Sequence, residues 1–265
     1  MTLHGAHMTR LIEIEQNEYT TILTMSAPQK RNAISFEMRS ELLEALTKAT
    51  QDPNIRAIIL TGHGEHFCAG GDLSAAHALA PDPNRTERNV KILQDIVRLM
   101  AGPKPVLAAV EGSAFGAGMS LAVACDFVIA AQGARFAASF AKVGLCADAG
   151  LTWFLPQRIG QARSRQLMIS GDVVDADQAL AIGLIDTLTE KGAALEAARI
   201  KARAIGALAP LSIATVKAAL SGQPSVFDAA LDLELSNQVR LATSADYLEG
   251  RAAFVEKRRA NFRGV

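Results

Sequence analysis

Two glycine-rich turns, each placed directly after a short apolar run, constrain the fold of this chain more than any other feature of its sequence. The runs 55–61 and 106–110 are almost entirely aliphatic, which is typical of strands buried on both faces of a sheet. The turns 67–73 and 112–118 follow them, and the second leads into a helix of small residues predicted over 119–124. Strand, turn and helix in this order favour an α/β fold with mostly parallel strands.

The rest of the chain shows patterns that predict a hairpin near the N-terminus and mostly helices toward the C-terminus. Alternating residues predict a hairpin over 11–25, and Ser35 is expected to cap a helix that runs to about Gln51. Asp175 and Gln178 have the spacing of a helix-capping pair. The other predicted elements are a helix over 86–101, a strand over 126–131, and helices near 192–208, 210–221, 224–241 and 244–258.

This order of elements suggests two parts. Residues 1–195 form an α/β core, and residues 196–265 form a C-terminal helical segment. The segment carries many apolar side chains without strands to cover, so we expect it to pack on the core or on another subunit.

The composition excludes several classes of protein. Among 265 residues, 49% are hydrophobic and 20% are charged, so a packed core is expected and global disorder is not. Lys plus Arg number 27, as do Asp plus Glu, so no excess charge predicts binding to nucleic acid or to an anionic membrane. No uncharged apolar stretch reaches the roughly 20 residues that a membrane span needs.

The cysteines and the N-terminus bear on the compartment. Cys68, Cys125 and Cys146 form no CxxC pair, and an odd number argues against a disulfide framework. Residues 1–10 contain no apolar run of the signal-peptide kind. These features predict reduced thiols in a cytoplasmic protein.

The two turns also carry a chemical prediction. A helix N-terminus offers unpaired N–H groups, and glycine lets a ligand approach the backbone closely. Two such turns side by side would aim two N–H donors at one oxygen, which is the geometry of an oxyanion hole. Close packing of helix on sheet explains the same small residues, so the turns alone leave both readings open. The G-x-G-x-x-G spacing of dinucleotide sites and the P-loop pattern are absent.

An ordered set of short motifs runs through the chain. In order they are Pro28-x-x-x-Asn32-Ala33-Ile34, Phe67-Cys68-Ala69-Gly70-Gly71-Asp72-Leu73, Gly112-x-Ala114-x-Gly116-Ala117-Gly118, Cys125-Asp126, Gly171-Asp172, Ala179, Gly183-Leu184-Ile185 and Glu249-Gly250-x-Ala252-Ala253-Phe254-x-Glu256-Lys257-Arg258. Together they resemble the enoyl-CoA hydratase/isomerase (crotonase) family over about residues 10–263. The resemblance implies a ββα spiral core with a C-terminal helical segment, an acyl-CoA thioester substrate, and a homotrimer or dimer of trimers.

The resemblance also implies roles for individual residues. The oxyanion donors would be the backbone N–H groups of Gly71 and Ala117. Residues implied to contact coenzyme A are Ala27, Lys30, Arg31, Ala69, Gly70, Asp72, Leu73, Phe254 and Lys257, with Asp72 mainly bracing its loop. Coenzyme A is part of the substrate, so no separate cofactor is implied. No metal is expected either, because His63 and His66 lack a third ligand and read as a solvent-exposed pair.

Two positions argue against water addition. Hydratases of this family hold and activate water with two glutamates, and the matching positions here are Ser120 and Phe140. Neither side chain can act as a general base. The standard hydratase route is therefore not expected.

One acidic residue, Asp148, remains as a candidate for the catalytic acid and base. Asp148 matches the acidic loop residue of isomerase-type members, such as ring-epoxyphenylacetyl-CoA isomerases and Δ3,Δ2-enoyl-CoA isomerases. Apolar neighbours such as Leu145 and Trp153 would raise its pKa toward a working value. We therefore predict isomerisation of an enoyl-CoA with Asp148 as the acid and base.

Four alternatives stay open from the sequence. Asp148 would serve equally as a cap for a helix that starts near Gly150. It would act as a nucleophile if the chain resembled the aryl-CoA dehalogenases of the family. The family label also covers enoyl-CoA hydratases. Finally, a protein that binds acyl-CoA but has lost its catalytic activity would also lack the two glutamates that Ser120 and Phe140 replace here.

Overall fold

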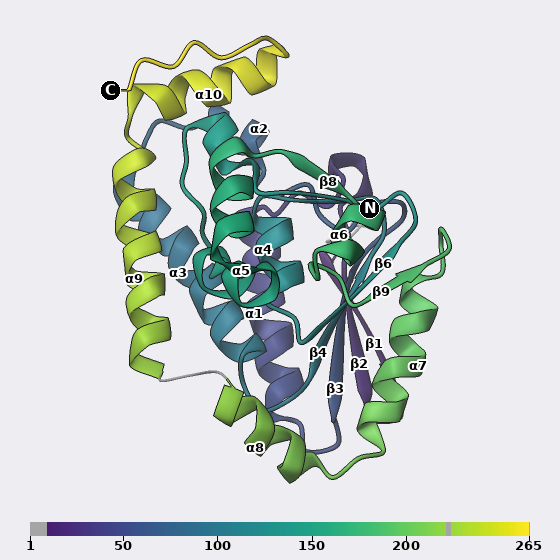
Figure 1. Ribbon diagram of the computed structural model, residues 1–265. Helices are drawn as coiled ribbons and strands as arrows, with labels where there is room; N and C mark the ends of the chain where they lie inside the picture. The colour runs from purple at the N-terminus through teal and green to yellow at the C-terminus, as the bar shows by residue number, and fades with distance from the viewer. Residues whose placement is uncertain (1–9, 221–223, 265) are drawn as a thin grey trace, which may run out of the picture.

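A six-stranded sheet forms the centre of the computed structural model, which describes residues 10–220 and 224–264 (Figure 1). The strand order is β1 (Ile12–Asn17), β2 (Thr20–Met25), β3 (Ala57–Gly62), β4 (Val106–Val110), β6 (Phe127–Ala131) and β9 (Thr187–Thr189). β1 and β2 form the predicted antiparallel hairpin, and all other neighbours in this sheet are parallel. The α/β class with mostly parallel strands is thus confirmed.

Helices cover both faces of this sheet (Figure 1). On one side lie α1 (Phe36–Gln51), α3 (Pro83–Met100), α5 (Leu151–Ser170) and α9 (Pro224–Leu241), and on the other lies α7 (Ala194–Gly206). Alternate residues of β3 point to the two layers, with Ile58 and Leu60 in the larger core and Ala57 and Ile59 against α7. Burial on both faces explains why this strand reads as an uninterrupted aliphatic run.

A second, smaller sheet carries the glycine-rich turns. It consists of β5 (Ser113–Phe115), β7 (Arg135–Ala137) and β8 (Val173–Asp175). Single bridges extend it, because Cys68 pairs with Ala114 and Ile34 pairs with Gly71. Three segments that are far apart in the sequence therefore run side by side where the turns lie.

The remaining elements are short or lie toward the C-terminus. They are the 3-10 turns η1 (Pro28–Lys30) and η2 (Ser139–Val143), and the helices α2 (Leu73–His77), α4 (Ala117–Val123), α6 (Ala176–Ala181), α8 (Pro210–Leu220) and α10 (Ala245–Glu256). α10 packs its backbone against η2, since a Cβ on Gly250 would lie 2.6 Å from the carbonyl oxygen of Val143.

The predicted helix starts agree with the structure at two caps and differ at a third. Ser35 accepts a hydrogen bond from the N–H of Met38, and Asp175 accepts one from the N–H of Gln178, as expected. The helix expected from residue 86 starts instead at Pro83, because Asp82 caps it and proline fits the first helical position. The domain boundary expected at residue 196 falls inside α7 and stays a prediction.

The structure bears on the expectation that no segment spans a membrane, and hardly at all on the expectation for residues 1–10. Within residues 10–220 and 224–264, no single helix has the length and apolarity to cross a membrane. One pair, α7 with α8, passes that test jointly by length and composition, but the pair is bent by 107°. The expectation for residues 1–10 lies almost wholly outside the described residues.

Asn32 joins the loops that approach the glycine-rich turns. Its side chain is fully buried, its Oδ1 accepts from the N–H of Ala27, and its Nδ2 donates to the carbonyl oxygens of His63 and His66. Its backbone is left-handed at φ 54°, a conformation that asparagine tolerates better than most residues. The side-chain amide of Asn32 thus pairs three backbone groups of neighbouring loops, and its backbone tolerates the left-handed turn.

We predict that Asn32→Ala lowers the free energy of unfolding by about 3 kcal/mol, because it leaves buried backbone groups unpaired and places alanine in a left-handed conformation. Urea unfolding followed by circular dichroism measures the change. Asn84→Ala is the matched control at an exposed position and should change stability by less than about 0.5 kcal/mol. Equal stability of the two variants would contradict this role for Asn32.

Candidate active site

A cavity of about 450 Å³ lies where the two turns, α1, α3, η2 and the C-terminal helices meet. Its wall includes the turn at Gly70 and Gly71, the start of α4 at Gly116 and Ala117, and Asp148 from the loop before α5. α9 contributes Gln238 to the same wall, and residues of α10 contribute as well. The volume is in the range of small-molecule sites.

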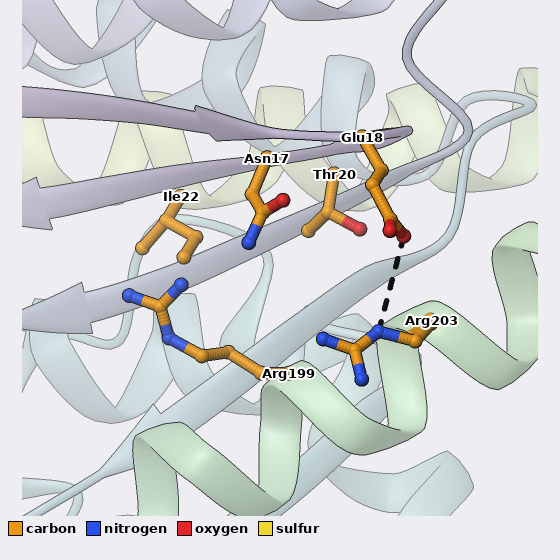
Figure 2. A pocket seen from close by; sticks show the side chains of 6 residues that line it. All are labelled: Asn17, Glu18, Thr20, Ile22, Arg199 and Arg203. Atoms are coloured by element: carbon orange, nitrogen blue, oxygen red, sulfur yellow. Dashed lines mark ion pairs between the residues drawn. The ribbon is translucent and has the colours of Figure 1, made fainter.

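A second hollow, between the β1–β2 turn and α7, is of a different kind (Figure 2). It holds only about 20 Å³, roughly the space of one water molecule. Arg203 is paired with Glu18 across it, and Arg199 is paired with Glu15. These arginines are therefore occupied in fastening the hairpin to α7, and the larger cavity is the candidate site.

The backbone N–H groups of Gly71 and of Ala117, the first residue of α4, are among those at the large cavity that have no protein acceptor within the described residues. The first-turn N–H groups of a helix lack partners inside the helix, which accounts for Ala117. Gly71 is free because its neighbours Gly70 and Asp72 make the loop's hydrogen bonds, through the Gly70 carbonyl and the Asp72 N–H, to both sides of Ile34.

Close backbone contact brings these two amides to the same wall. A Cβ built on Gly70 would lie 3.7 Å from the Cα of Gly116, so the two turns touch. Gly116 has φ 52° and ψ −123°, a conformation open almost only to glycine. A Cβ on Gly118 would lie 2.4 Å from the carbonyl oxygen of Cys68, so the start of α4 can sit this close only with glycine there. Packing and site formation thus use the same small residues.

Asp148 is 7% exposed and is held by one hydrogen bond. Its Oδ2 accepts from Nε2 of Gln238 at 2.9 Å, and its Oδ1 is buried with no hydrogen-bond partner. Gln238 also donates to the carbonyl oxygen of Cys146 at 3.0 Å. The loop of Asp148 is therefore fixed from α9, about 90 residues further along the chain.

The cap of α5 is Glu234, not Asp148. Oε2 of Glu234 accepts from the N–H of Gly150, and its Oε1 accepts from the N–H and the hydroxyl of Thr152. The interpretation of Asp148 as a side-chain cap is therefore wrong, because a carboxylate from a distant helix takes that place. The Asp148 carboxylate is left at the cavity wall.

The surroundings of Asp148 favour its protonated form. Burial and, to a smaller extent, the nearby Glu234 carboxylate raise the pKa of Asp148, which is about 7 when all influences are combined. The positive charge of Arg39 and the hydrogen bond from Gln238 oppose that rise. Burial also raises the pKa of Glu234, against the hydrogen bonds from Thr152 and Gly150. A carboxyl group with a pKa near neutrality can both take up and release a proton.

The two positions expected to hold hydratase glutamates contribute no carboxylate. Ser120 is fully buried in α4, where its hydroxyl donates to the carbonyl oxygen of Gly116. Phe140 lies on η2 and forms part of the cavity wall. Among the described residues that line the cavity, the acidic ones are Asp148 and Asp72, and Asp72 is ion-paired with Lys30.

The residues expected to contact coenzyme A lie in two places. Those that line the cavity are Ala69, Gly70, Asp72, Leu73 and Phe254. Those outside its lining are Ala27, Lys30, Arg31 and Lys257. Lys30 pairs with Asp72, which agrees with a bracing role for Asp72, while Lys257 ends α10 with an exposed, left-handed backbone. The contacts of both groups with coenzyme A stay predictions.

The prediction that His63 and His66 are both exposed to solvent is correct for His63 and wrong for His66. His63 is exposed, but His66 is partly buried and its Nδ1 accepts from the N–H of Ser113. Burial accordingly lowers the pKa of His66. Within residues 10–220 and 224–264, no group of three or more His, Cys, Asp or Glu side chains could hold a metal ion.

Three polar residues at the site were missed in the sequence. Glu234 and Gln238 lie one helical turn apart on α9, on the buried stripe that includes Leu231. Polar residues at positions where a helix otherwise buries apolar side chains could have been recognised in the sequence as candidates for a site. Arg39 gave no such signal, because an arginine on an amphipathic helix is usually solvated.

Comparison with known proteins gives consistent results. The family model for enoyl-CoA hydratase/isomerase matches residues 15–265. The chain is 37% identical to 1,2-epoxyphenylacetyl-CoA isomerase of Escherichia coli K12, over 91% of this chain and 94% of that one. It is 33% identical to crotonyl-CoA hydratase of Syntrophomonas wolfei, over 95% and 97%. The crystal structure of an enoyl-CoA hydratase/isomerase from Pseudoalteromonas atlantica superposes with TM-score 0.85 at 30% identity, over 96% and 100%. The predicted crotonase fold is thereby confirmed.

We predict that Asp148→Asn becomes more stable relative to the unchanged protein as pH rises. The pKa of Asp148 is about 7 in the folded state, above its unfolded value of about 3.9, so the folded state binds the extra proton. That stability is fully present below pH 3.9 and is lost as pH rises through 7. Asparagine imitates the neutral acid, so the stability difference should shift by about 2–3 kcal/mol in favour of the variant between pH 5 and pH 8.

Chemical unfolding at the two pH values measures this shift. Asp232→Asn, which changes an exposed aspartate on α9, is the control and should follow the unchanged protein at both. A stability difference for Asp148→Asn that does not depend on pH would mean that Asp148 is ionised throughout.

Proposed function

The chain belongs to the enoyl-CoA hydratase/isomerase family, and from this premise we propose that it moves a double bond within an enoyl-CoA thioester, with Asp148 carrying the proton. The observation that carries this proposal is one buried carboxyl group, Asp148, in the lining of the same cavity as the N–H groups of Gly71 and Ala117, for which the described residues provide no acceptor.

The two N–H groups would stabilise the charge that the reaction develops. Removing a proton from the carbon next to a thioester carbonyl leaves an enolate, with negative charge on the carbonyl oxygen. Donors at Gly71 and Ala117 that are already in place need no rearrangement as that charge forms. Losing one donor of this kind typically raises a barrier by about 2.7–4 kcal/mol.

Asp148 would complete the reaction by itself. In its ionised form it takes a proton from C2 of a 3-enoyl-CoA, and the electrons of that C–H bond form the enolate. The enolate electrons then return, the double bond moves to C2–C3, and Asp148 gives its proton to C4. Oδ1 has no hydrogen-bond partner within the described residues, whereas Oδ2 accepts from Gln238. A pKa near 7 suits a group that must act first as base and then as acid.

Hydration is the second candidate, because the family includes hydratases such as the crotonyl-CoA hydratase of S. wolfei. Water addition by the usual route of the family needs two carboxylates, and Ser120 and Phe140 stand at both matching positions. The E. coli relative is named as an isomerase of 1,2-epoxyphenylacetyl-CoA, so the relatives include isomerases as well as hydratases.

The proposed function also includes an oligomeric assembly, a cytoplasmic location and contacts with the coenzyme A part of the substrate. A homotrimer or dimer of trimers would cover apolar side chains that one chain leaves exposed on α8, among them Leu211, which is 83% exposed, and Leu220, which is 75% exposed. Coenzyme A would enter as part of the substrate, past Lys30 and Phe254. A cytoplasmic location stays a prediction from the sequence.

We predict that the purified protein converts 3-hexenoyl-CoA to 2-hexenoyl-CoA faster than it forms 3-hydroxyhexanoyl-CoA. Asp148→Asn should lower kcat for this migration at least about 100-fold, because general acid–base catalysis contributes roughly 10²–10⁴ in rate. Liquid chromatography with mass spectrometry separates the two products and gives both rates.

Asp232→Asn is again the control and should keep the full rate. Undiminished migration in Asp148→Asn, or hydration as the main reaction, would overturn the proposal. An ester trapped on Asp148 would point to nucleophilic catalysis instead. Binding of an acyl-CoA without exchange of its C2 protons in deuterium oxide would mark a protein that binds acyl-CoA but does not react with it.

A further inference from the structure

Arg39 places a guanidinium group in the wall of the cavity. It comes from the first half of α1, and it lies beside the turn of Gly71, where a Cβ built on the glycine would be 3.7 Å from its NH2 atom. Asp148 and Tyr247 are the other polar groups near enough to act on its charge from the cavity side. Arg39 is thus next to the reacting part of a bound acyl group.

This guanidinium has no protein partner in the described part of the chain. Its Nε is buried without a hydrogen bond, and neither of its other nitrogens takes part in a hydrogen bond or ion pair there. Arg39 as a whole is partly buried. An arginine partly withdrawn from water usually has a carboxylate or several carbonyl oxygens around it, because an unpaired charge out of water is costly. Arg251 on α10 also has a buried Nε without a partner, but it differs from Arg39 because its NH1 donates to the carbonyl oxygens of Ala76 and Leu79.

Arg39 has no ion-pair partner within the described residues, and Glu37, an exposed carboxylate on the same helix, acts on its charge only from a distance. Burial lowers its pKa, but a guanidinium stays protonated at any physiological pH. Burial raises the pKa of Asp148 to about 7, so this carboxyl group is ionised only in part near neutral pH. The Cys68 thiol, with its pKa raised to about 12, is neutral, and burial likewise raises the pKa of Tyr247. Asp72 is paired with Lys30.

We propose that Arg39 selects acyl groups that carry an oxygen acceptor a few carbons from the thioester. A hydrocarbon chain packed against the guanidinium would leave its donors without partners and remove them from water. A ketone, ether, hydroxyl or carboxylate oxygen at that distance would accept from it. The acceptor must lie close to the thioester because Arg39 adjoins Gly71. The inference rests on the proposed function in one respect only, that the acyl thioester occupies this cavity.

The binding of two unreactive probes tests the inference. Pentanoyl-CoA and 4-oxopentanoyl-CoA have the same number of acyl carbons and differ by one carbonyl oxygen in place of two hydrogens. Titration calorimetry should show that the unchanged protein binds 4-oxopentanoyl-CoA roughly tenfold or more tightly, the usual effect of a hydrogen bond to a charged donor. Arg39→Met should remove this preference and leave the affinity for pentanoyl-CoA equal or higher.

Matched variants separate this role from a structural one. Arg88→Met makes the same change at an exposed arginine of α3 outside the cavity lining and should keep the preference. Arg39→Lys keeps the charge and should keep part of the preference, which also guards against a folding defect in Arg39→Met. Thermal unfolding checks all three variants.

Several outcomes would overturn the inference. Equal affinity of the unchanged protein for both probes would do so, as would a preference that survives in Arg39→Met. An equal loss of affinity for both probes in Arg39→Met would place Arg39 on the thioester or on coenzyme A instead. Neither probe has a carbon–carbon double bond, so the result does not depend on isomerisation. A preference lost in Arg39→Met would stand even if the proposed reaction failed.

Discussion

The hydrogen bonds between three distant loops are the constraint on which this site depends. The N–H of Ile34 donates to the carbonyl oxygen of Gly70, and the N–H groups of Cys68 and Phe115 complete a ladder to β5. With its neighbours fixed in this way, the N–H of Gly71 finds no acceptor in the described protein, and neither does that of Ala117 at the start of α4. The loops are therefore held in place by the bonds they make, and the two residues with free N–H groups line the cavity. Preorganised donors of this kind are what enolate chemistry requires.

A second constraint links the C-terminal helices to the chemistry. α9 places Gln238 on one oxygen of Asp148 and Glu234 on the start of α5, so one helix both orients the acid and alters its electrostatic surroundings. α10 closes the site by packing Gly250 against Val143 and by donating from Arg251 to the carbonyl oxygen of Ala76 in α2. The helical segment is thus part of the active region and not an appendage to the core.

The sequence predicted the local features well, because each was set by neighbouring residues. The strands buried on both faces, the hairpin, and the caps at Ser35 and Asp175 all follow from patterns a few residues long. The family motifs also pointed to Gly71, Ala117 and Asp148, which the structure places on one cavity wall. What could not be predicted depends on contacts across the chain. Glu234 replaces Asp148 as the cap of α5 from more than 80 residues away.

In the proposed reaction, the amides of Gly71 and Ala117 both donate to the thioester oxygen. The most direct test is the infrared stretch of a ¹³C-labelled thioester carbonyl in bound butanoyl-CoA, compared with the same compound in water. Two preorganised donors should move this stretch to clearly lower frequency than water does, because they polarise the carbonyl more strongly. A carbonyl stretch at or above its frequency in water would show that the oxygen lies away from these amides, and the account of the site would be wrong.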